Sequence, residues 1–277
     1  MRQGMPRLTA VGFNPRTFKG PMAGTRQNMP GISGVIITLN EEKNIARCIR
    51  SLEGVCDEII VLDSGSVDKT SAIAAELGAV VLERPWAGYA ATKNFANAQA
   101  RFDYILSIDA DEALSEELRA NILAAREALQ GAYRFNRLTN YCGHWIRYSG
   151  WYPDPKTRLF PKSGARWVGD FVHESLQVDP ELPIRHLRGD LWHYSFVSLS
   201  DHLRRVDTYS DLAAREMLKA GKPVSLAKLL LSPFLKFFKS FFLKQGFRDG
   251  FPGFSIAVIS AFDVFIRYAK VRMGGPS

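Results

Sequence analysis

Three short apolar runs, each ending in a cluster of polar residues, most strongly constrain how this 277-residue chain folds. The runs occupy residues 34–39, 58–62 and 104–108 and contain β-branched residues that favour strands. In the segments that follow the first two, residues 43–52 and 71–77, apolar residues recur with helical spacing. A strand, a polar turn and a helix repeated in this order are typical of a parallel α/β sheet. The sequence therefore predicts an α/β fold.

Polar side chains stand at the same end of each predicted strand. Residues 38–41 read Thr-Leu-Asn-Glu, residues 63–66 read Asp-Ser-Gly-Ser, and Asp109 and Asp111 follow the third strand. Because ligands of open α/β sheets bind outside the carboxyl ends of the strands, we expect these clusters to converge on one crevice. Two carboxylates there suit a hard divalent cation that also binds substrate phosphates, which indicates a metal-bound nucleotide. The alternative is that these polar residues only form turns and cap helices.

The three clusters together resemble the nucleotide-sugar motifs of family 2 glycosyltransferases with the GT-A fold. Further stretches resemble the bacterial lipopolysaccharide inner-core β-1,4-glucosyltransferase branch of that family, and these are Trp-Ala-Gly-Tyr at 86–89, Lys93-Asn94, residues 154–160 and Val-His-Glu at 172–174. The resemblance implies a Rossmann-like, mostly parallel sheet flanked by helices. It also implies an inverting, metal-dependent hexosyltransferase that moves glucose from UDP-glucose to a saccharide acceptor in lipopolysaccharide core or a related envelope glycan.

The resemblance further implies where the nucleotide sugar and its metal bind. A nucleoside-binding set is expected at the first two strand ends: Thr38, Asn40, Glu41, Asp63, Ser64 and Gly65. Asp111 is the first choice for direct coordination of Mg²⁺ or Mn²⁺, and Asp109 either reaches the ribose or shares the metal. His193 is a possible third ligand, with an ordinary histidine packed beside two aromatic residues as the alternative.

An inverting transfer needs a general base on the acceptor hydroxyl, normally a carboxylate within hydrogen-bond reach. Glu174, a polar residue in an otherwise apolar segment, is the first candidate, and Asp154 is the second. His173 would orient Glu174 or touch the acceptor. Arg158 would bind a phosphate of donor or acceptor, because its guanidinium suits phosphate geometry. Lys93 would meet the diphosphate or the donor sugar, unless it is a solvated helix residue.

Charge is distributed unevenly along the chain, whose formal net charge is +8. Residues 1–30 hold five Lys or Arg and no acids, and residues 215–277 hold eleven against three acids. Two basic ends around a mildly acidic middle indicate an anionic partner, either nucleic acid or a membrane surface. The basic residues match no nucleic-acid-binding module, so we expect no nucleic-acid partner and favour an anionic membrane surface.

The basic C-terminal part also carries an aromatic helical pattern. In residues 229–244, phenylalanines at 234, 237, 238, 241 and 242 share one arc, with Lys236 and Lys239 opposite. Neither this stretch nor residues 251–268 contains eighteen uncharged apolar residues, so the pattern predicts a helix lying in the bilayer interface and not a spanning one. The alternative is an amphipathic helix packed on the catalytic domain. The expected organisation is a disordered basic extension (1–30), a GT-A catalytic domain (31–215) and a helical membrane-associating region (216–277).

The cysteines at 48, 56 and 142 form no CxxC pair and are expected to be reduced thiols. Together with the basic ends, they predict a cytoplasmic protein held peripherally on the inner face of the cytoplasmic membrane. Two alternatives stay open: a glycosyltransferase acting on a polyprenyl phosphate acceptor, and a non-catalytic nucleotide-binding protein. A dinucleotide-dependent dehydrogenase is disfavoured, because no GxGxxG follows the first strand.

Overall fold

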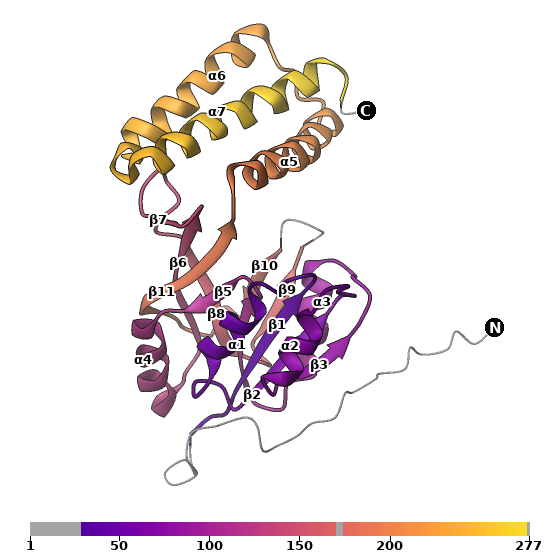
Figure 1. Cartoon of the computed structure of the whole chain (residues 1–277), viewed down its shortest axis with the longest axis vertical. Helices are drawn as coiled ribbons and strands as arrows, with labels where there is room; N and C mark the ends of the chain where they lie inside the picture. Colours follow the sequence, from indigo (N-terminus) through magenta and orange to yellow (C-terminus); the bar gives the residue numbers. More distant parts are fainter. Residues whose placement is uncertain (1–28, 170–173, 276–277) are drawn as a thin grey trace, which may run out of the picture. The chain divides into compact units, whose positions relative to one another are not determined.

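The computed structural model describes residues 29–169 and 174–275 and divides the chain into two compact units (Figure 1). The first unit comprises Met1–Arg137 and Pro155–His193, and the second comprises Leu138–Asp154 and Tyr194–Ser277. Nearly all of the basic extension expected at 1–30 lies outside the described residues. The domain boundary expected at residue 215 falls inside helix α5 (Leu199–Lys219), which packs against α7 (Gly250–Arg272). This packing gives the second unit more chain than the sequence reasoning assigned to it.

A sheet forms the centre of the first unit. Four strands, in the order β3-β2-β1-β4, are parallel: β1 (Ile32–Thr38), β2 (Glu58–Asp63), β3 (Val80–Glu83) and β4 (Tyr104–Asp109). The order continues through β8 (Pro155–Pro161), β6 (Ala132–Tyr141), β11 (Ile184–Phe196) and β5 (Glu112–Leu114). The β4–β8, β8–β6 and β11–β5 pairs are antiparallel. A separate antiparallel pair joins β9 (Ala165–Val168) and β10 (Ser175–Val178). The parallel pairs described here therefore all lie among β1–β4.

Helices cover both faces of the parallel strands. On one face, Ile36 of β1 belongs to an apolar cluster with Ile45 and Ile49 of α1 (Ile45–Leu52). On the other face, Val35 belongs to a cluster with Ala96 of α3 (Tyr89–Ala98). Because successive strand residues point to opposite faces, strands covered on both sides read as unbroken apolar runs. The remaining helices of this unit are α2 (Thr70–Glu76), α4 (Glu116–Ala125) and the 3₁₀ turn η1 (Arg126–Ala128). The α/β fold class with flanking helices is thus confirmed.

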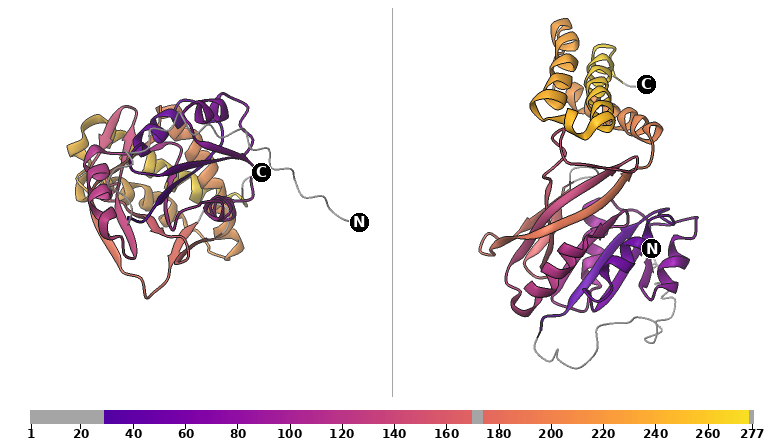
Figure 2. Two further views of the ribbon diagram at one scale, coloured as in Figure 1. Left: turned by 90° about the horizontal axis from the view of Figure 1, so that it is seen from below. Right: turned by 60° about the vertical axis from the view of Figure 1, so that its left-hand side comes forward.

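The second unit is mainly helical (Figures 1 and 2). It contains β7 (His144–Ile146), which pairs with the end of β6, and the helices α5, α6 (Leu226–Phe238), η2 (Lys239–Leu243), η3 (Gly246–Asp249) and α7. The hydroxyl of Tyr141 lies 2.8 Å from Nδ1 of His202 in a cluster that includes Trp151 and Phe196. Burial, followed by the nearby charge of Arg205, lowers the pKa of His202 to about 4. His202 is therefore a neutral packing residue of this unit.

One helical segment in the described ranges, Gly246–Arg272, is long and apolar enough to cross a membrane by length and composition alone. Only 28% of its most apolar 18-residue stretch is buried inside the protein. The sequence reasoning set such a helix aside because Asp263 and Arg267 interrupt the apolar run, and in the structure these two side chains pair at 3.0 Å. Pairing one turn apart lowers the cost of keeping two charges on an apolar helix.

Candidate active site

The carboxyl ends of three parallel strands lie side by side. Thr38 of β1 stands opposite Asp63 of β2, and Ile37 stands opposite Asp109 of β4. This register brings the three polar clusters together, as the order of strands and helices predicts. Thr38 is only 5% exposed, and among the described residues its hydroxyl and that of Ser64 are buried without a hydrogen-bond partner. Such orphaned polar atoms are typical of a place that a ligand or water fills.

Hydrogen bonds link the first two polar clusters to each other. The backbone N–H of Asn40 donates to Ser66 Oγ at 2.8 Å, and that of Glu41 donates to Thr70 Oγ1 at 2.8 Å. Asp63 is 2% exposed, and its carboxylate accepts the backbone N–H of Ser66 at 2.9 Å. Gly65 follows at φ +101°, a conformation that favours glycine. Asn40, Glu41, Asp63 and Gly65 therefore lie in two loops that hydrogen bonds link at the strand ends, and their contact with a nucleoside stays a prediction.

The turn after β4 carries three acids, Asp109, Asp111 and Glu112. Asp109 Oδ1 lies 2.9 Å from Lys93 Nζ, and its Oδ2 accepts a hydrogen bond from Arg158 at 2.7 Å. Glu112 is fully buried; its Oε1 accepts a second bond from Arg158 at 2.9 Å, and its Oε2 accepts the backbone N–H of Asp109, also at 2.9 Å. The buried Arg158 thus joins two carboxylates of one turn. Its expected contact with a substrate phosphate stays a prediction.

The charges of this cluster stabilise one another. Loss of contact with water alone would raise the pKa of Asp109, but Arg158 and Lys93 outweigh it and hold that pKa far below the usual range. Burial also disfavours the charged form of Arg158 and so lowers its pKa, but Asp109 and Glu112 raise this pKa by more than burial lowers it. An opposite charge within hydrogen-bond distance favours the charged form of both partners. The pairing therefore favours the charged forms of both Asp109 and Arg158.

Lys93 of α3 is buried in the same cluster, with only 1% of its surface exposed. Its ammonium lies 3.6 Å from Oε1 of Glu174 and 4.4 Å from the centre of the Trp167 ring. The structure thereby excludes the alternative that Lys93 is a solvated helix residue. Glu174, the first candidate for the base, is 24% exposed at its side chain, so it lies at the rim of the cluster. His173, expected to orient it, lies outside the described residues, and Asp154 belongs to the second unit.

Asp111 faces a different partner. The pairing of β11 with β5 places His193 opposite Glu112, and Nε2 of His193 lies 3.3 Å from Oδ2 of Asp111. Both side chains are partly exposed, at 14% for His193 and 20% for Asp111. Among residues 29–169 and 174–275, no group of three His, Cys, Asp or Glu side chains could hold a metal by itself. A carboxylate and an imidazole nevertheless fit an incomplete site whose remaining ligands are water and the phosphates of a nucleotide.

Two parts of the cluster were missed by the sequence reasoning. Glu112 connects the turn to Arg158, and Nη1 of Arg137 lies 3.6 Å from the same carboxylate. Trp167 lies beneath the ammonium of Lys93. The one signal in the sequence was the third acid directly after the Asp-x-Asp pair. No local pattern indicates which distant arginine or tryptophan meets it.

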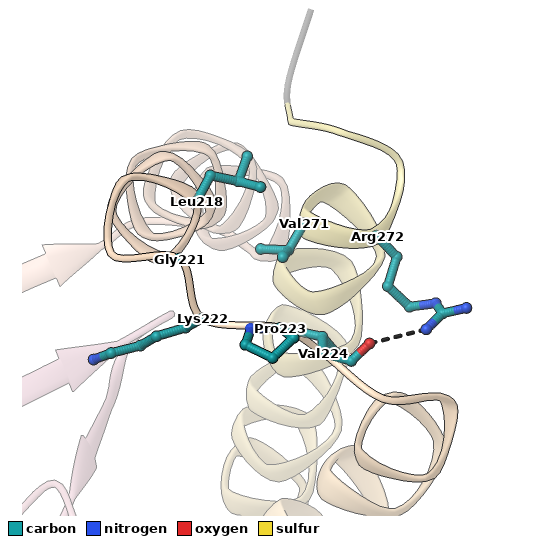
Figure 3. Close-up of a pocket in the computed structure, with 7 residues that line it drawn as sticks. All are labelled: Leu218, Gly221, Lys222, Pro223, Val224, Val271 and Arg272. Atoms are coloured by element: carbon teal, nitrogen blue, oxygen red, sulfur yellow. Dashed lines mark hydrogen bonds between the residues drawn. The ribbon is translucent and has the colours of Figure 1, made fainter.

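A cavity of about 370 Å³ in the second unit is a separate feature (Figure 3). It lies where the turn after α5 meets the end of α7. Its two basic side chains, Lys222 and Arg272, point away from each other, and Arg272 donates to the carbonyl of Val224 at 2.9 Å. Without converging polar groups, this cavity lacks the character of a nucleotide site.

Comparison with known proteins agrees with the residues gathered at the strand ends. The family model "Glycosyl transferase family 2" matches residues 33–160. An uncharacterized glycosyltransferase of Rickettsia typhi is 36% identical over 262 residues, covering 88% of this chain and 87% of the relative. The lipopolysaccharide core biosynthesis glycosyltransferase LpsC of Rhizobium meliloti is 32% identical over 250 residues, covering 87% and 91%.

A solved structure, glucosyl-3-phosphoglycerate synthase from Mycobacterium tuberculosis, is 28% identical over 40% of this chain and 44% of its own. Its TM-score of 0.33 is too low to establish a common fold. The family assignment rests instead on relatives that match almost the whole chain and share the name glycosyltransferase. This chain is a glycosyltransferase of family 2.

Proposed function

We propose that this glycosyltransferase moves a hexose, glucose from UDP-glucose, to a saccharide acceptor of lipopolysaccharide core or a related envelope glycan, with inversion at the transferred carbon. The observation that carries the proposal is the acidic turn after β4, with Asp111 beside His193 and Asp109 beside Lys93 and Glu174. The relative LpsC, named for lipopolysaccharide core biosynthesis, supports the acceptor class.

In this proposal the nucleotide lies across the strand ends. The unpartnered hydroxyls of Thr38 and Ser64 offer hydrogen bonds to the nucleoside, and Asp63 keeps the second loop in shape. Asp111 and His193 would hold Mg²⁺ or Mn²⁺, which neutralises the charge that develops on the departing nucleoside diphosphate. Arg158 keeps the turn that carries Asp111 in place through its bonds to Asp109 and Glu112.

Glu174 is the proposed general base. A carboxylate in this role accepts the proton of the acceptor hydroxyl while that oxygen forms the new glycosidic bond. The partly exposed side chain of Glu174 suits this role, since an acceptor entering from solvent can approach it, and Lys93 fixes its position from the buried side. Asp154 is the second candidate for the base.

The donor proposal is tested by thermal unfolding of the protein with nucleoside diphosphates and nucleotide sugars, each with and without Mn²⁺ or Mg²⁺. A ligand that binds only the folded state stabilises it by about 2.7 kcal/mol at a hundred times its Kd. We expect the melting temperature to rise with uridine nucleotides when a divalent cation is present, and most with the true donor. Unchanged melting temperatures with every nucleotide and both metals would contradict the proposed donor and support a protein that keeps the fold without this chemistry.

We further propose that α6 and α7 place the enzyme at the cytoplasmic face of an anionic membrane. The two helices pack side by side (Figures 1 and 2), and α6 has no buried residue. Large apolar side chains are exposed along α6, η2, η3 and α7: Leu226, Leu230, Leu231, Phe234, Leu235, Phe238, Phe242, Leu243, Phe247, Phe251, Phe254, Val258, Phe262 and Phe265. The exposed lysines 228, 236, 239 and 244 lie between them. Apolar surface with interleaved cations suits the interface of anionic lipid.

A charge-insertion variant tests membrane binding. Phe234 and Leu235 of α6 are 68% and 61% exposed, so glutamates there should leave the fold intact and prevent insertion. Burying one such side chain contributes about 1.5–3 kcal/mol, so the double variant Phe234→Glu/Leu235→Glu should lose membrane affinity by roughly a hundredfold or more. The measurement is flotation with vesicles that contain phosphatidylglycerol.

The matched control for this variant is Val67→Glu/Val197→Glu, which adds the same charge at side chains that are 92% and 73% exposed in other parts of the chain. It should float like the wild type. Equal flotation of wild type and the α6 variant would refute the proposed membrane surface, and a concentration-dependent dimer in solution would assign the apolar helices to a second copy of this chain.

A further inference from the structure

Lys93 is a buried charge held by two acids with different proposed tasks. Its ammonium lies 2.9 Å from Oδ1 of Asp109, in the acidic turn, and 3.6 Å from Oε1 of Glu174, the proposed base. Burying an ammonium is costly unless it is paired, so the position of Lys93 depends on these carboxylates. Conversely, the ammonium of Lys93 attracts both carboxylates and helps to fix their positions.

The position of Lys93 is set by α3 and β9 without any ligand. The side chain of the next residue, Asn94, donates to the carbonyl of Trp167 at 2.8 Å and accepts the backbone N–H of Trp167 at 3.0 Å. These two bonds fasten α3 to β9, and the Trp167 ring then lies 4.4 Å from the ammonium, within the range of a cation–π contact. Lys93 is therefore part of a preformed support for the site.

Both oxygens of Asp109 are engaged by cations. Lys93 pairs with Oδ1, and Arg158 donates to Oδ2 at 2.7 Å. A divalent cation approaching Asp109 would meet two positive charges a few ångströms away, whose repulsion is strong in a partly desolvated site. Asp111, in contrast, is paired with an imidazole, His193, which is itself a good metal ligand when neutral.

We propose that Lys93 is a positioning residue that withholds Asp109 from the metal, so that the divalent cation is held by Asp111 and His193 and binds well only together with the diphosphate of the donor. The inference rests on the proposed function, because it concerns the same nucleotide–metal site. Two protein ligands alone make a weak site, and the phosphate oxygens complete it. The enzyme thereby binds the metal together with the donor and binds the free cation only weakly.

The experiment is a titration with Mn²⁺ in which the free ion is measured by electron paramagnetic resonance, with and without saturating UDP. The wild type should bind Mn²⁺ at least about tenfold more tightly when UDP is present. Lys93→Met removes one of the two cations at Asp109 and should raise Mn²⁺ affinity without nucleotide by about tenfold or more. Lys93→Arg keeps the charge and should behave as the wild type. A purely structural role of Lys93 would not raise affinity in any variant.

A double variant tests whether Asp109 is the carboxylate that becomes available to Mn²⁺ when Lys93 is replaced. The gain in Lys93→Met should vanish in Lys93→Met/Asp109→Asn, and melting temperatures establish that each variant is folded. If Lys93→Met does not fold, Asp109→Asn alone decides the question: it should bind Mn²⁺ with UDP within about threefold of the wild type, a difference below 1 kcal/mol. A loss as large as that of Asp111→Asn would overturn the inference.

The outcomes separate this inference from the proposed function. UDP-dependent Mn²⁺ binding by the wild type, with no gain in folded Lys93→Met, would overturn the role of Lys93 and leave the proposed function standing. No Mn²⁺ binding by the wild type even with UDP would overturn both.

Discussion

Replacing Asp111 with Asn is expected to lower kcat/KM for sugar transfer by about a thousandfold, corresponding to about 4 kcal/mol of lost transition-state stabilisation. The amide keeps the shape of the side chain but removes the negative charge that would hold the metal beside His193. The side chain is 20% exposed and pairs only loosely with His193 at 3.3 Å, so folding should be little affected. The measurement is turnover of the donor identified by thermal unfolding, with the melting temperature determined on the same samples.

Asp103→Asn is the matched control for Asp111→Asn. It makes the same chemical change at an exposed residue just before β4, whereas Asp111 follows that strand's other end. We expect activity within about twofold of the wild type, which is less than 0.5 kcal/mol. Retained activity in Asp111→Asn itself would remove this residue from the metal site and turn attention to Asp109.

Replacing Glu174 with Gln is expected to lower kcat by a factor of about 10² to 10⁴, the usual contribution of a general base. The glutamine keeps the size of the side chain but cannot accept the proton of the acceptor hydroxyl. Because Glu174 pairs with Lys93 and does not belong to the loops at the strand ends, binding of the donor should be unchanged. Steady-state kinetics with varied acceptor, together with nucleotide-induced thermal stabilisation, separates the loss of the chemical step from a loss of donor binding.

Glu181→Gln, at an exposed residue after β10, is the corresponding control and should retain wild-type kinetics. Asp154→Asn is the competing variant. If it abolishes transfer while Glu174→Gln remains active, the base is Asp154, and Lys93 then pairs with Glu174 for structural reasons only.

The parallel half of the sheet could be predicted because its signals are local. The apolar runs that became β1, β2 and β4 are buried on both faces, and their polar ends are adjacent in the register. The antiparallel half carries weaker signals, because β8 and β11 mix charged and apolar residues without a regular alternation. Pairing between strands that are distant in sequence depends on packing, which no local pattern records.

The structure brings together several residues that the sequence singled out, but the contacts among them could not be predicted. Asp109, Asp111 and Glu174 were named from their positions after strands and in apolar segments. The partners were not: Arg158 joins Asp109 and Glu112, and Lys93 is buried although its helix position alone allowed a solvated side chain. The expected contact of Arg158 with a phosphate stays a prediction. A charged residue reveals its partner only through the tertiary structure that brings the two together.

The C-terminal aromatic pattern was only partly informative. The predicted helix is present as α6 followed by η2, and the second apolar stretch is the longer helix α7. Of the phenylalanines on one arc, Phe237 and Phe241 pack against Phe254 of α7, with ring centres 6.0 Å and 5.7 Å away, whereas Phe234 is exposed. Helical periodicity shows that these phenylalanines lie on one face of the helix. It does not show which of them pack against a neighbouring helix and which are exposed.

The acidic turn has a consequence for how the chain acquires its activity during synthesis. Its acids, at residues 109–112, follow Lys93 in the chain but leave the ribosome well before two of their other partners, since Arg158 lies 49 residues after Asp109 and His193 lies still later. Chains fold from the N-terminus as they are made, so the first strands can pair before Arg158 has joined this turn. A nascent chain that ends with the family-matched stretch at residue 160 would lack His193 and Glu174. If Asp111 and His193 hold the metal as proposed, the site is complete only once β11 has joined the sheet, because β11 carries His193.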